Sequence, residues 1–223
     1  MSTAAVAALS QGASTPAVIA WAAREIVARQ PTMELLVDAG CGRGELARAL
    51  QGRVGRTLGL DAVAYDGLGA GPGIEFRRAD LNRVPFPVAD GCADAAVAVE
   101  TIEHLENPRA LVRELVRMTK PGGLVVVTTP NQASWLSKLS LVCKHQFTAF
   151  QEAPGLYPTH ITALLPADLR HIGQECGLQQ IEILYSGHGR LPGSARHYPL
   201  GLSRRWGRAM SDNVMLVGRK AQA

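Results

Sequence analysis

Short apolar runs alternate along this chain with segments of helical periodicity, and this alternation is the feature that most restricts its fold. Short apolar runs bounded by turn signals are typical of strands buried on both faces, which occur in parallel sheets connected by helices. The alternation therefore predicts an α/β sheet with helices on its faces. We expect strands at residues 34–38, 56–61, 74–79, 93–99, 124–128, 180–185 and 213–217, and helices at 16–30, 45–50 and 166–176, with a further helix starting at 108.

The helix that starts at residue 108 has the clearest boundary signals. Asn107 is a favoured N-cap, and Pro108 suits the first helical position. Leu111, Leu115 and Met118 recur at helical spacing and mark one apolar face. The Pro-Gly-Gly sequence at 121–123 is expected to end this helix before the next strand.

The composition permits a buried core. The chain has 223 residues, of which 47% are hydrophobic and 19% charged, whereas disordered chains are poor in apolar and rich in charged residues. No window reaches the roughly 20 mostly apolar residues that a membrane-spanning helix needs. We expect one domain over residues 1–223, in which residues 1–15 form a flexible arm without the positive start of a secretory signal.

The four cysteines lie far apart in the sequence and show no paired spacing. They are Cys41, Cys92, Cys143 and Cys176. This pattern is typical of a protein from a reducing compartment rather than of a disulfide framework or a zinc site. It predicts a cytoplasmic protein.

Two long stretches interrupt the alternation, at residues 132–165 and 187–210. The first holds four of the eleven aromatic residues, namely Trp135, Phe147, Phe150 and Tyr157, and the second is rich in Gly, Pro and Arg. Because long irregular insertions in a compact domain are usually functional, we expect both to form a cap on the substrate side. Two alternatives for the first stretch are an amphipathic helix packed on the sheet edge and, with Lys138 and Lys144, a segment that rests on a membrane surface.

The end of the chain is basic. From residue 183 onwards it carries seven Lys or Arg and one Asp, a net charge of +6, whereas the first 182 residues carry −2. Such an end fits an acidic substrate, a nucleic acid, an anionic membrane surface or a solvated tail. Only Tyr198 and Trp206 interleave with the arginines of 187–210, so a nucleic acid is the least favoured of these partners.

A glycine-rich turn, VDAGCGRGE over 37–45, joins the first strand to its helix. Glycines allow a ligand to approach the backbone closely, and ligands of doubly wound sheets bind at the carboxyl ends of the strands. Asp61 closes the second strand, where a carboxylate can accept both hydroxyls of a ribose. Asp80 closes the third strand, where it can accept the amino group of an adenine. The G-x-G-x-G spacing differs from the G-x-G-x-x-G of dinucleotide dehydrogenases.

The segment ETIEH, at 100–104 after the fourth strand, is rich in groups that bind cations or protons. On a helical turn, Glu100, Glu103 and His104 stand at i, i+3 and i+4 and project from one face. They can hold a divalent cation of the Mg or Mn type, with His160 as a fourth ligand, or position a general base. The alternative is that Glu100 lines a cofactor pocket, Glu103 lies on the surface, and His104 packs or acts as a base.

Together these motifs resemble the class I S-adenosylmethionine-dependent methyltransferases. The matching segments are VDAGCGRGELA (37–47), LGLDA (58–62), RRADL (77–81), VAVETIEHLENP (97–108) and TKPGGLVVVTTPN (119–131). The resemblance implies a Rossmann-like, mostly parallel sheet of seven strands with an antiparallel last strand and helices on both faces. It also implies S-adenosylmethionine bound by Asp38, Gly40, Cys41, Gly42, Gly44, Asp61, Asp80, Leu81 and Glu100.

The E-x-x-E-H sequence with a distant histidine is similar to two branches of these enzymes. One is the ubiquinone-biosynthesis O-methyltransferases, and the other is the small-RNA 3′-terminal 2′-O-methyltransferases. In both, the resemblance implies Mg or another divalent cation that grips the accepting hydroxyl and lowers its pKa. The implied ligands are Glu100, Glu103, His104 and His160.

We therefore predict an enzyme that moves a methyl group from S-adenosylmethionine to a hydroxyl of a small molecule, with His104 and Glu103 as catalytic residues. Alignment supplies much of the acceleration, and the protein must help to remove the acceptor's proton. The basic loop favours an anionic acceptor. The alternatives are an N-methyltransferase, an RNA 2′-O-methyltransferase, a cofactor-binding protein without catalysis, and a nicotinamide-dependent oxidoreductase, against which the absence of a Tyr-x-x-x-Lys pair counts. The sequence leaves the oligomeric state open.

Overall fold

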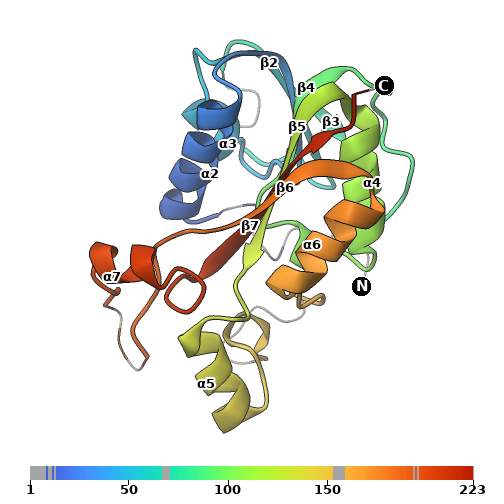
Figure 1. Cartoon of the computed structure of the whole chain (residues 1–223). Coiled ribbons are helices and arrows are strands. Elements are labelled where there is room, and N and C mark those ends of the chain that lie inside the picture. Colours follow the sequence, from blue (N-terminus) through green and yellow to red (C-terminus); the bar gives the residue numbers. More distant parts are fainter. Residues whose placement is uncertain are drawn as a thin grey trace.

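The computed structural model describes residues 9, 12, 14–66, 71–152, 159–192, 194 and 196–222 (Figure 1). Tyr157 and most of the expected arm at 1–15 lie outside these residues. The strands are β1 (Met33–Ala39), β2 (Val54–Asp61), β3 (Ile74–Arg78), β4 (Ala93–Ala98), β5 (Thr119–Pro130), β6 (Leu178–Tyr185) and β7 (Asn213–Lys220). The helices are α2 (Pro16–Arg29), α3 (Glu45–Ala49), α4 (Pro108–Met118), α5 (Trp135–Lys144), α6 (Pro166–Glu175) and α7 (Leu200–Arg205), with 3₁₀ turns η1 (Ile102–His104) and η2 (Thr148–Phe150).

Within the described residues, the strands form one seven-stranded sheet in the order β3-β2-β1-β4-β5-β7-β6. β1 pairs in parallel with both β2 and β4, so the chain turns to opposite sides of β1 at this point. β7 is antiparallel to both of its neighbours, β5 and β6. The predicted mostly parallel sheet with an antiparallel last strand is confirmed.

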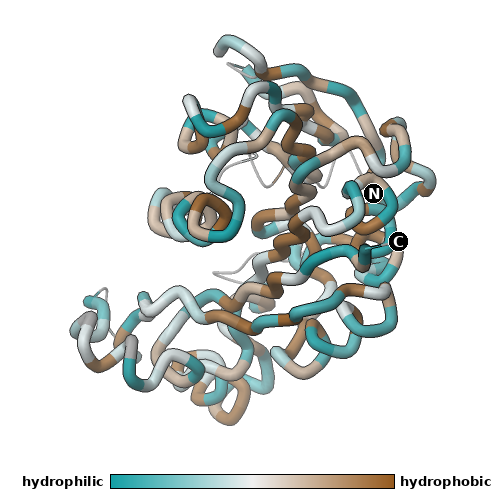
Figure 2. The backbone as a smooth tube through the Cα atoms, turned by 45° about the horizontal axis from the view of Figure 1, so that its top comes forward, coloured by the Kyte–Doolittle hydropathy of each residue, from teal (hydrophilic) through white to brown (hydrophobic). Residues whose placement is uncertain are grey.

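Helices cover both faces of the sheet, because successive strand residues point to opposite sides. Val125 and Val127 of β5 pack with the apolar residues of α4 and α6. Leu124 and Val126 of the same strand pack with those of α2 and α3. Figure 2 shows the hydrophobic residues concentrated in the central strands.

The start of α4 agrees with its sequence signals. The side chain of Asn107 accepts a hydrogen bond from the backbone N–H of Ala110 at 3.0 Å, and Pro108 occupies the first helical position. The apolar face with Leu111, Leu115 and Met118 is fully buried against the sheet. The predicted N-cap and core face of this helix are confirmed.

Strand boundaries differ from the expectation at the end of the sheet. The Pro-Gly-Gly sequence at 121–123 belongs to β5 rather than to a stop before it, and the register with β4 shifts between Ala93 and Ala95. Leu178 of β6 pairs with Lys220 of β7. β6 therefore begins before the expected limit at 180, and β7 ends after the expected limit at 217. Backbone pairing holds these polar ends in the sheet, and a search for apolar runs overlooks such ends. No helix in the part of the chain that the structure describes is long and apolar enough to cross a membrane.

Candidate functional site

A cleft of about 1990 Å³ opens at the carboxyl ends of β1, β2, β4 and β5. Its lining includes the residues that directly follow these strands, namely Gly40, Ala62, Val99 and Asn131. Because β1 lies between β2 and β4, the cleft lies where the strand order reverses, which is the usual ligand position in doubly wound sheets. Pockets for one small ligand usually measure about 300–1,000 Å³, so this cleft has room for two molecules.

The glycine-rich turn is held against the end of β2. Gly40 and Cys41 donate their backbone N–H groups to the carbonyl of Leu60, at 2.7 and 3.1 Å. Gly40 has a φ of +82°, and a Cβ on it would lie 2.2 Å from Oγ1 of Thr101. A side chain at position 40 would therefore be strained in its backbone and would collide with Thr101.

Two buried aspartates lie at the floor of the cleft. Asp61 accepts hydrogen bonds from the backbone N–H groups of Gly42, at 3.0 Å, and Val63, at 3.2 Å. Burial, together with the negative charge of Asp61, raises the pKa of Asp38 to about 7. Such a pair favours a ligand that brings a positive charge or hydrogen-bond donors.

Most of the predicted cofactor residues line the cleft. They are Asp38, Gly40, Cys41, Gly42, Asp61, Leu81 and Glu100. Gly44 and Asp80 are absent from the lining, and Asp80 instead accepts a hydrogen bond from the backbone of Asn82 and faces Arg83 at 3.4 Å. The sequence reasoning missed Gly12 and Ser14, which line the cleft ahead of α2. The backbone carbonyl of Gly12 accepts a hydrogen bond from the backbone N–H of Arg43 in the glycine-rich turn. No sequence motif predicts this contact.

Glu100 is turned toward β5 and β7. Thr128 accepts a hydrogen bond from the backbone N–H of Glu100 at 3.0 Å, and its hydroxyl donates to Oε1 at 2.9 Å. Asn213 donates to Oε2 at 2.8 Å. Burial raises the pKa of this carboxyl to about 7. Glu100 has a φ of +50° and precedes η1, so the expected helical turn that would carry it on one face with Glu103 and His104 is wrong.

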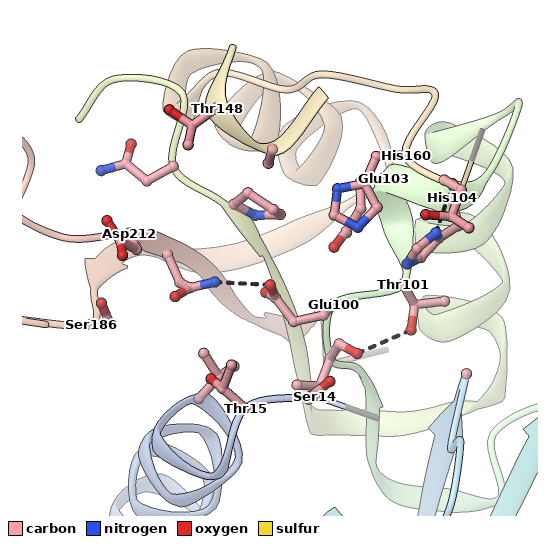
Figure 3. A pocket seen from close by; sticks show the side chains of 18 of the residues that line it. Ser14, Thr15, Glu100, Thr101, Glu103, His104, Thr148, His160, Ser186 and Asp212 are labelled. Carbon is pink, nitrogen blue, oxygen red and sulfur yellow. Dashed lines mark hydrogen bonds between the residues drawn. The ribbon is translucent and has the colours of Figure 1, made fainter. Parts of the chain in front are cut away.

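Glu103, His104 and His160 form a compact cluster on another side of the cleft (Figure 3). Each offers one ligand atom, and these atoms all lie within 4.8 Å of one another. Nδ1 of His104 lies 2.7 Å from the carbonyl of Thr159, which can only accept, so Nδ1 carries the hydrogen and Nε2 keeps its lone pair. The alternative in which Glu103 lies on the surface is wrong, because its side chain is fully buried.

Two atoms of this cluster lack a partner within the described residues. They are Oε1 of Glu103 and Nδ1 of His160. The other carboxylate oxygen of Glu103 accepts a hydrogen bond from the hydroxyl of Thr129 at 3.1 Å. A buried polar atom without a partner costs about 1–3 kcal/mol of stability. A bound group that contacts these two atoms would therefore recover this free energy.

Burial also sets the protonation of the cluster. It raises the pKa of Glu103 well above its ordinary value, and the nearby charge of Glu100 adds to this shift. It lowers the pKa of His104, and burial with the His104 charge lowers that of His160 to about 4. Both imidazoles are therefore neutral at pH 7. Two neutral imidazoles and one carboxyl group, which would release its proton on binding a cation, form a donor set that suits a divalent transition metal.

Both insertions contribute to the lining of the cleft. Leu136 and Ser140 of α5 lie on it, as do His188 and His197, whose rings stack with their centroids 4.0 Å apart. The described aromatic residues of 132–165 do not line it. Phe150 instead contacts the ring of His160 at a centroid distance of 5.5 Å. The role of these insertions as a cap stays a prediction.

The fold and the cleft together define an α/β protein built to bind a nucleotide-like ligand at a topological switch point. Residues 17–183 match the model of a family described as the methyltransferase domain. This match covers most of the chain, and the chain therefore belongs to the methyltransferase-domain family. Membership favours the methyltransferase interpretation over the nicotinamide-dependent one.

Relatives and solved structures agree with this family. The chain is 28% identical over 182 residues to a Mycolicibacterium smegmatis protein named as a probable S-adenosylmethionine-dependent methyltransferase, covering 79% of this chain and 65% of that protein. It is 26% identical over 183 residues to the ubiquinone biosynthesis O-methyltransferase of Pseudomonas fluorescens, covering 74% and 72%. A solved S-adenosylmethionine-dependent methyltransferase of Thermotoga maritima superposes with a TM-score of 0.64 at 16% identity, covering 92% and 89%, and shows the fold alone.

Proposed function

We propose that this chain transfers a methyl group from S-adenosylmethionine to a hydroxyl of a small molecule, with a divalent cation held by Glu103, His104 and His160. The observation that carries this proposal is the convergence of one ligand atom from each of these three residues within 4.8 Å, in a cluster where two buried side-chain atoms, Oε1 of Glu103 and Nδ1 of His160, have no partner in the described part of the chain. Family membership supports methyl transfer. The name of the Pseudomonas relative supports a hydroxyl acceptor.

The donor belongs at the glycine-rich turn. S-adenosylmethionine, when bound, supplies a methyl group already activated on a sulfonium. Asp61 would accept hydrogen bonds from the ribose hydroxyls, since its carboxylate retains acceptor capacity beyond its backbone hydrogen bonds. Asp38 provides a carboxylate for a cationic group, and Gly40, Cys41, Gly42 and Leu81 shape the crevice. Gly44 and Asp80 act indirectly in this proposal, through the conformation of their loops.

The cluster residues fit a cation because neighbouring groups of the protein orient their side chains. A bound divalent cation supplies a positive charge that lowers the pKa of an acceptor hydroxyl. The Thr159 carbonyl fixes the tautomer of His104 so that Nε2 is available, and Thr129 orients Glu103, as partners of metal ligands usually do. Glu100 is hydrogen-bonded to Thr128 and Asn213, so we do not assign it to the cation. We assign it to the side of the cleft that would hold the methyl donor, called the donor side below, and the side with Glu103, His104 and His160 is called the cluster side.

A metal-free reaction is the main competitor of this proposal. In it, His104 takes the proton of the acceptor as a general base, which its lowered pKa and the lone pair on Nε2 permit. That role gives no function to Oε1 of Glu103 or to Nδ1 of His160, both buried without a partner among the described residues. The cation explains all three groups, and we therefore favour it.

Metal titration tests the cation site directly. The full chain, treated with EDTA and dialysed, is titrated with Mn²⁺ by calorimetry. We expect about one bound ion per chain, lost in His160→Gln because a required ligand is gone. His171→Gln is the matched control, since His171 is exposed on α6. Equal binding by the two variants, or no binding by the parent chain, would contradict the cation site.

The acceptor class needs a separate measurement. The chain is incubated with S-adenosylmethionine and, in separate reactions, catechol, aniline or a single-stranded RNA, and products are identified by mass spectrometry. We expect methylation of catechol, whose hydroxyls match a cation-assisted site. Transfer to aniline alone would favour N-methylation, and transfer only to a single-stranded RNA would favour the 2′-O alternative. Failure of the chain to bind S-adenosylmethionine in calorimetry would overturn the proposed function itself.

A further inference from the structure

One side of α5 lines the cleft, and the opposite side is exposed. Leu136, Ser140 and Cys143 lie on the cleft. Trp135 and Val142 are seven residues apart and therefore share the other side of the helix. Trp135 is 54% exposed and Val142 is 75% exposed, and neither lines the cleft. The acceptor site therefore does not explain these two exposed apolar side chains.

A second exposed apolar group lies beside the start of α5. Trp206, which directly follows α7, is 55% exposed, and Leu202 of α7 is 42% exposed. The backbone N–H of Trp135 donates to the carbonyl of Ala209 at 2.7 Å, which joins the two segments. Figure 1 shows α5 and α7 at the end of the molecule away from the C-terminus of the chain. Trp135, Val142, Leu202 and Trp206 are called the apolar rim below.

The two segments that carry the apolar rim are basic, and one of their arginines, Arg190, forms an ion pair with Asp212 at 3.0 Å. Segments 131–151 and 186–211, which contain α5 and α7, hold seven Lys or Arg and no Asp or Glu. The rest of the chain holds 16 basic and 19 acidic residues, a net charge of −3. Nζ of Lys138, on the outer side of α5, lies 5.4 Å from the centroid of the Trp135 ring. The apolar rim therefore lies in the one strongly basic part of the sequence.

We propose that the apolar rim docks this chain on the surface of an anionic lipid membrane. Tryptophan and aliphatic side chains enter the boundary between headgroups and acyl chains, while Lys and Arg contact the anionic headgroups. A nucleic acid would use the positive charge but would leave Val142 and Leu202 without a role, since aliphatic side chains neither pair with phosphates nor offer the aromatic faces on which bases stack. Because the inner side of α5 lines the cleft, docking brings the cleft to the membrane surface.

Vesicle binding tests this proposal independently of methyl transfer. The full chain is sedimented with phosphatidylcholine vesicles, with or without about 30% phosphatidylglycerol. We expect binding to be roughly tenfold or more stronger with the anionic lipid and to weaken with salt. Val142→Glu should reduce it by roughly tenfold or more, because it removes an inserted apolar group and adds a repelled charge. Val84→Glu is the matched control, since Val84 is 54% exposed in the loop that follows β3.

A milder variant and a spectroscopic readout guard against misfolding. Val142→Ser should weaken vesicle binding by a smaller factor than Val142→Glu while the melting temperature stays unchanged. Tryptophan emission should shift to the blue on anionic vesicles, and the shift should vanish in a Trp135→Phe/Trp206→Phe chain, because Trp21 is already buried. Equal binding to both vesicle types overturns the proposal. A chain that binds poly(U) but no vesicles also overturns the proposal, if Val142→Glu and Val142→Ser leave the poly(U) binding unchanged.

Discussion

The two sides of the cleft differ in whether their buried polar groups have hydrogen-bond partners in the protein. On the donor side, Asp61 and Glu100 both accept hydrogen bonds from the protein itself. On the cluster side, Oε1 of Glu103 and Nδ1 of His160 have no partner within the described residues. Buried polar groups are almost always paired, and the carboxyl oxygens of Asp61 and Glu100 follow this rule, whereas two buried atoms of the cluster side depart from it.

The local cause of this difference is a change of backbone direction between Glu100 and Glu103. Glu100 has a φ of +50°, which directs its carboxyl to Thr128 and Asn213. The 3₁₀ turn η1 then directs Glu103 inward, toward His160. A regular helix would have placed both carboxyls on one face, so the irregular backbone separates a donor-side carboxyl from a cluster-side carboxyl.

The largest predicted effect comes from removing the charge of Glu103. We expect Glu103→Gln to lower methyl transfer by about 10²–10⁴-fold, because the cation loses its one carboxylate ligand. The same change should raise the melting temperature in EDTA at pH 7.5. Burial holds the pKa of the folded carboxyl well above its ordinary value, so this carboxyl costs stability once the pH exceeds its pKa in the unfolded chain, and the amide avoids that cost. Initial rates and thermal denaturation measure the two effects.

Glu34→Gln is the matched control for this prediction, since the Glu34 side chain is 89% exposed. It should change neither rate nor melting temperature appreciably. In the parent chain, Mn²⁺ should raise the melting temperature, and in Glu103→Gln it should not. A Glu103→Gln protein that melts lower in EDTA than the parent chain would show that Oε1 of Glu103 already has a structural partner.

The next effect concerns the donor side at varied pH. The pKa of Asp38 is raised from 3.8 to about 7 by burial and by Asp61. Since the folded chain holds this proton after the unfolded chain has lost it, stability without ligand should fall as the pH rises from about 4 to about 7. The contribution of this carboxyl is roughly 2–4 kcal/mol. Urea denaturation at several pH values measures it.

Asp38→Asn should make that pH dependence shallower, because the amide does not titrate. Asp66→Asn provides the comparison, since Asp66 is an exposed aspartate outside the site. Parallel pH profiles for the parent chain and Asp38→Asn would mean that Asp38 ionises normally, and the donor side would then be complete without a ligand's charge.

The sheet could be predicted because its signals are local. The mostly apolar run of β4 and the capping residues at Asn107 and Pro108 each determine their own segment, whatever the rest of the chain does. The bulged start of β5 and the polar end of β7 depend on pairing with a neighbouring strand instead. Pairing between distant segments leaves no pattern within either one, so these boundaries were missed.

The candidate site shows the same division. His104 and Glu103 adjoin a strand end and could be named from the sequence, and His160 could be added as a distant partner. The positive φ of Glu100 could not be foreseen, because it depends on Thr128 and Asn213 on other strands. The spacing E-x-x-E-H thus identified the residues correctly as neighbours of the cleft but gave a wrong local geometry.

A smaller effect separates backbone strain from crowding in the donor turn. Gly40 and Gly52 have similar φ values, +82° and +79°, but a Cβ on Gly52 would meet nothing within 4 Å. Gly52→Ala should therefore cost about 1 kcal/mol of unfolding free energy from conformation alone. Gly40→Ala should cost roughly 1–3 kcal/mol more, because its methyl collides with Thr101, and it should also abolish binding of S-adenosylhomocysteine in calorimetry. Equal costs for the two variants would show that Thr101 moves aside freely.

The smallest effect sets the scale for an ordinary polar contact away from both sides of the cleft. Asn107→Ala removes the N-cap of α4, whose side chain accepts from Ala110 at 3.0 Å. It should lower the unfolding free energy by about 1 kcal/mol in urea denaturation and leave Mn²⁺ and S-adenosylhomocysteine binding unchanged. Removing a satisfied contact thus lowers stability, whereas Glu103→Gln, which changes a carboxyl with an unpaired oxygen, should raise stability in EDTA. If both variants shifted stability in the same direction, the contrast between complete and incomplete sides would lose its energetic basis.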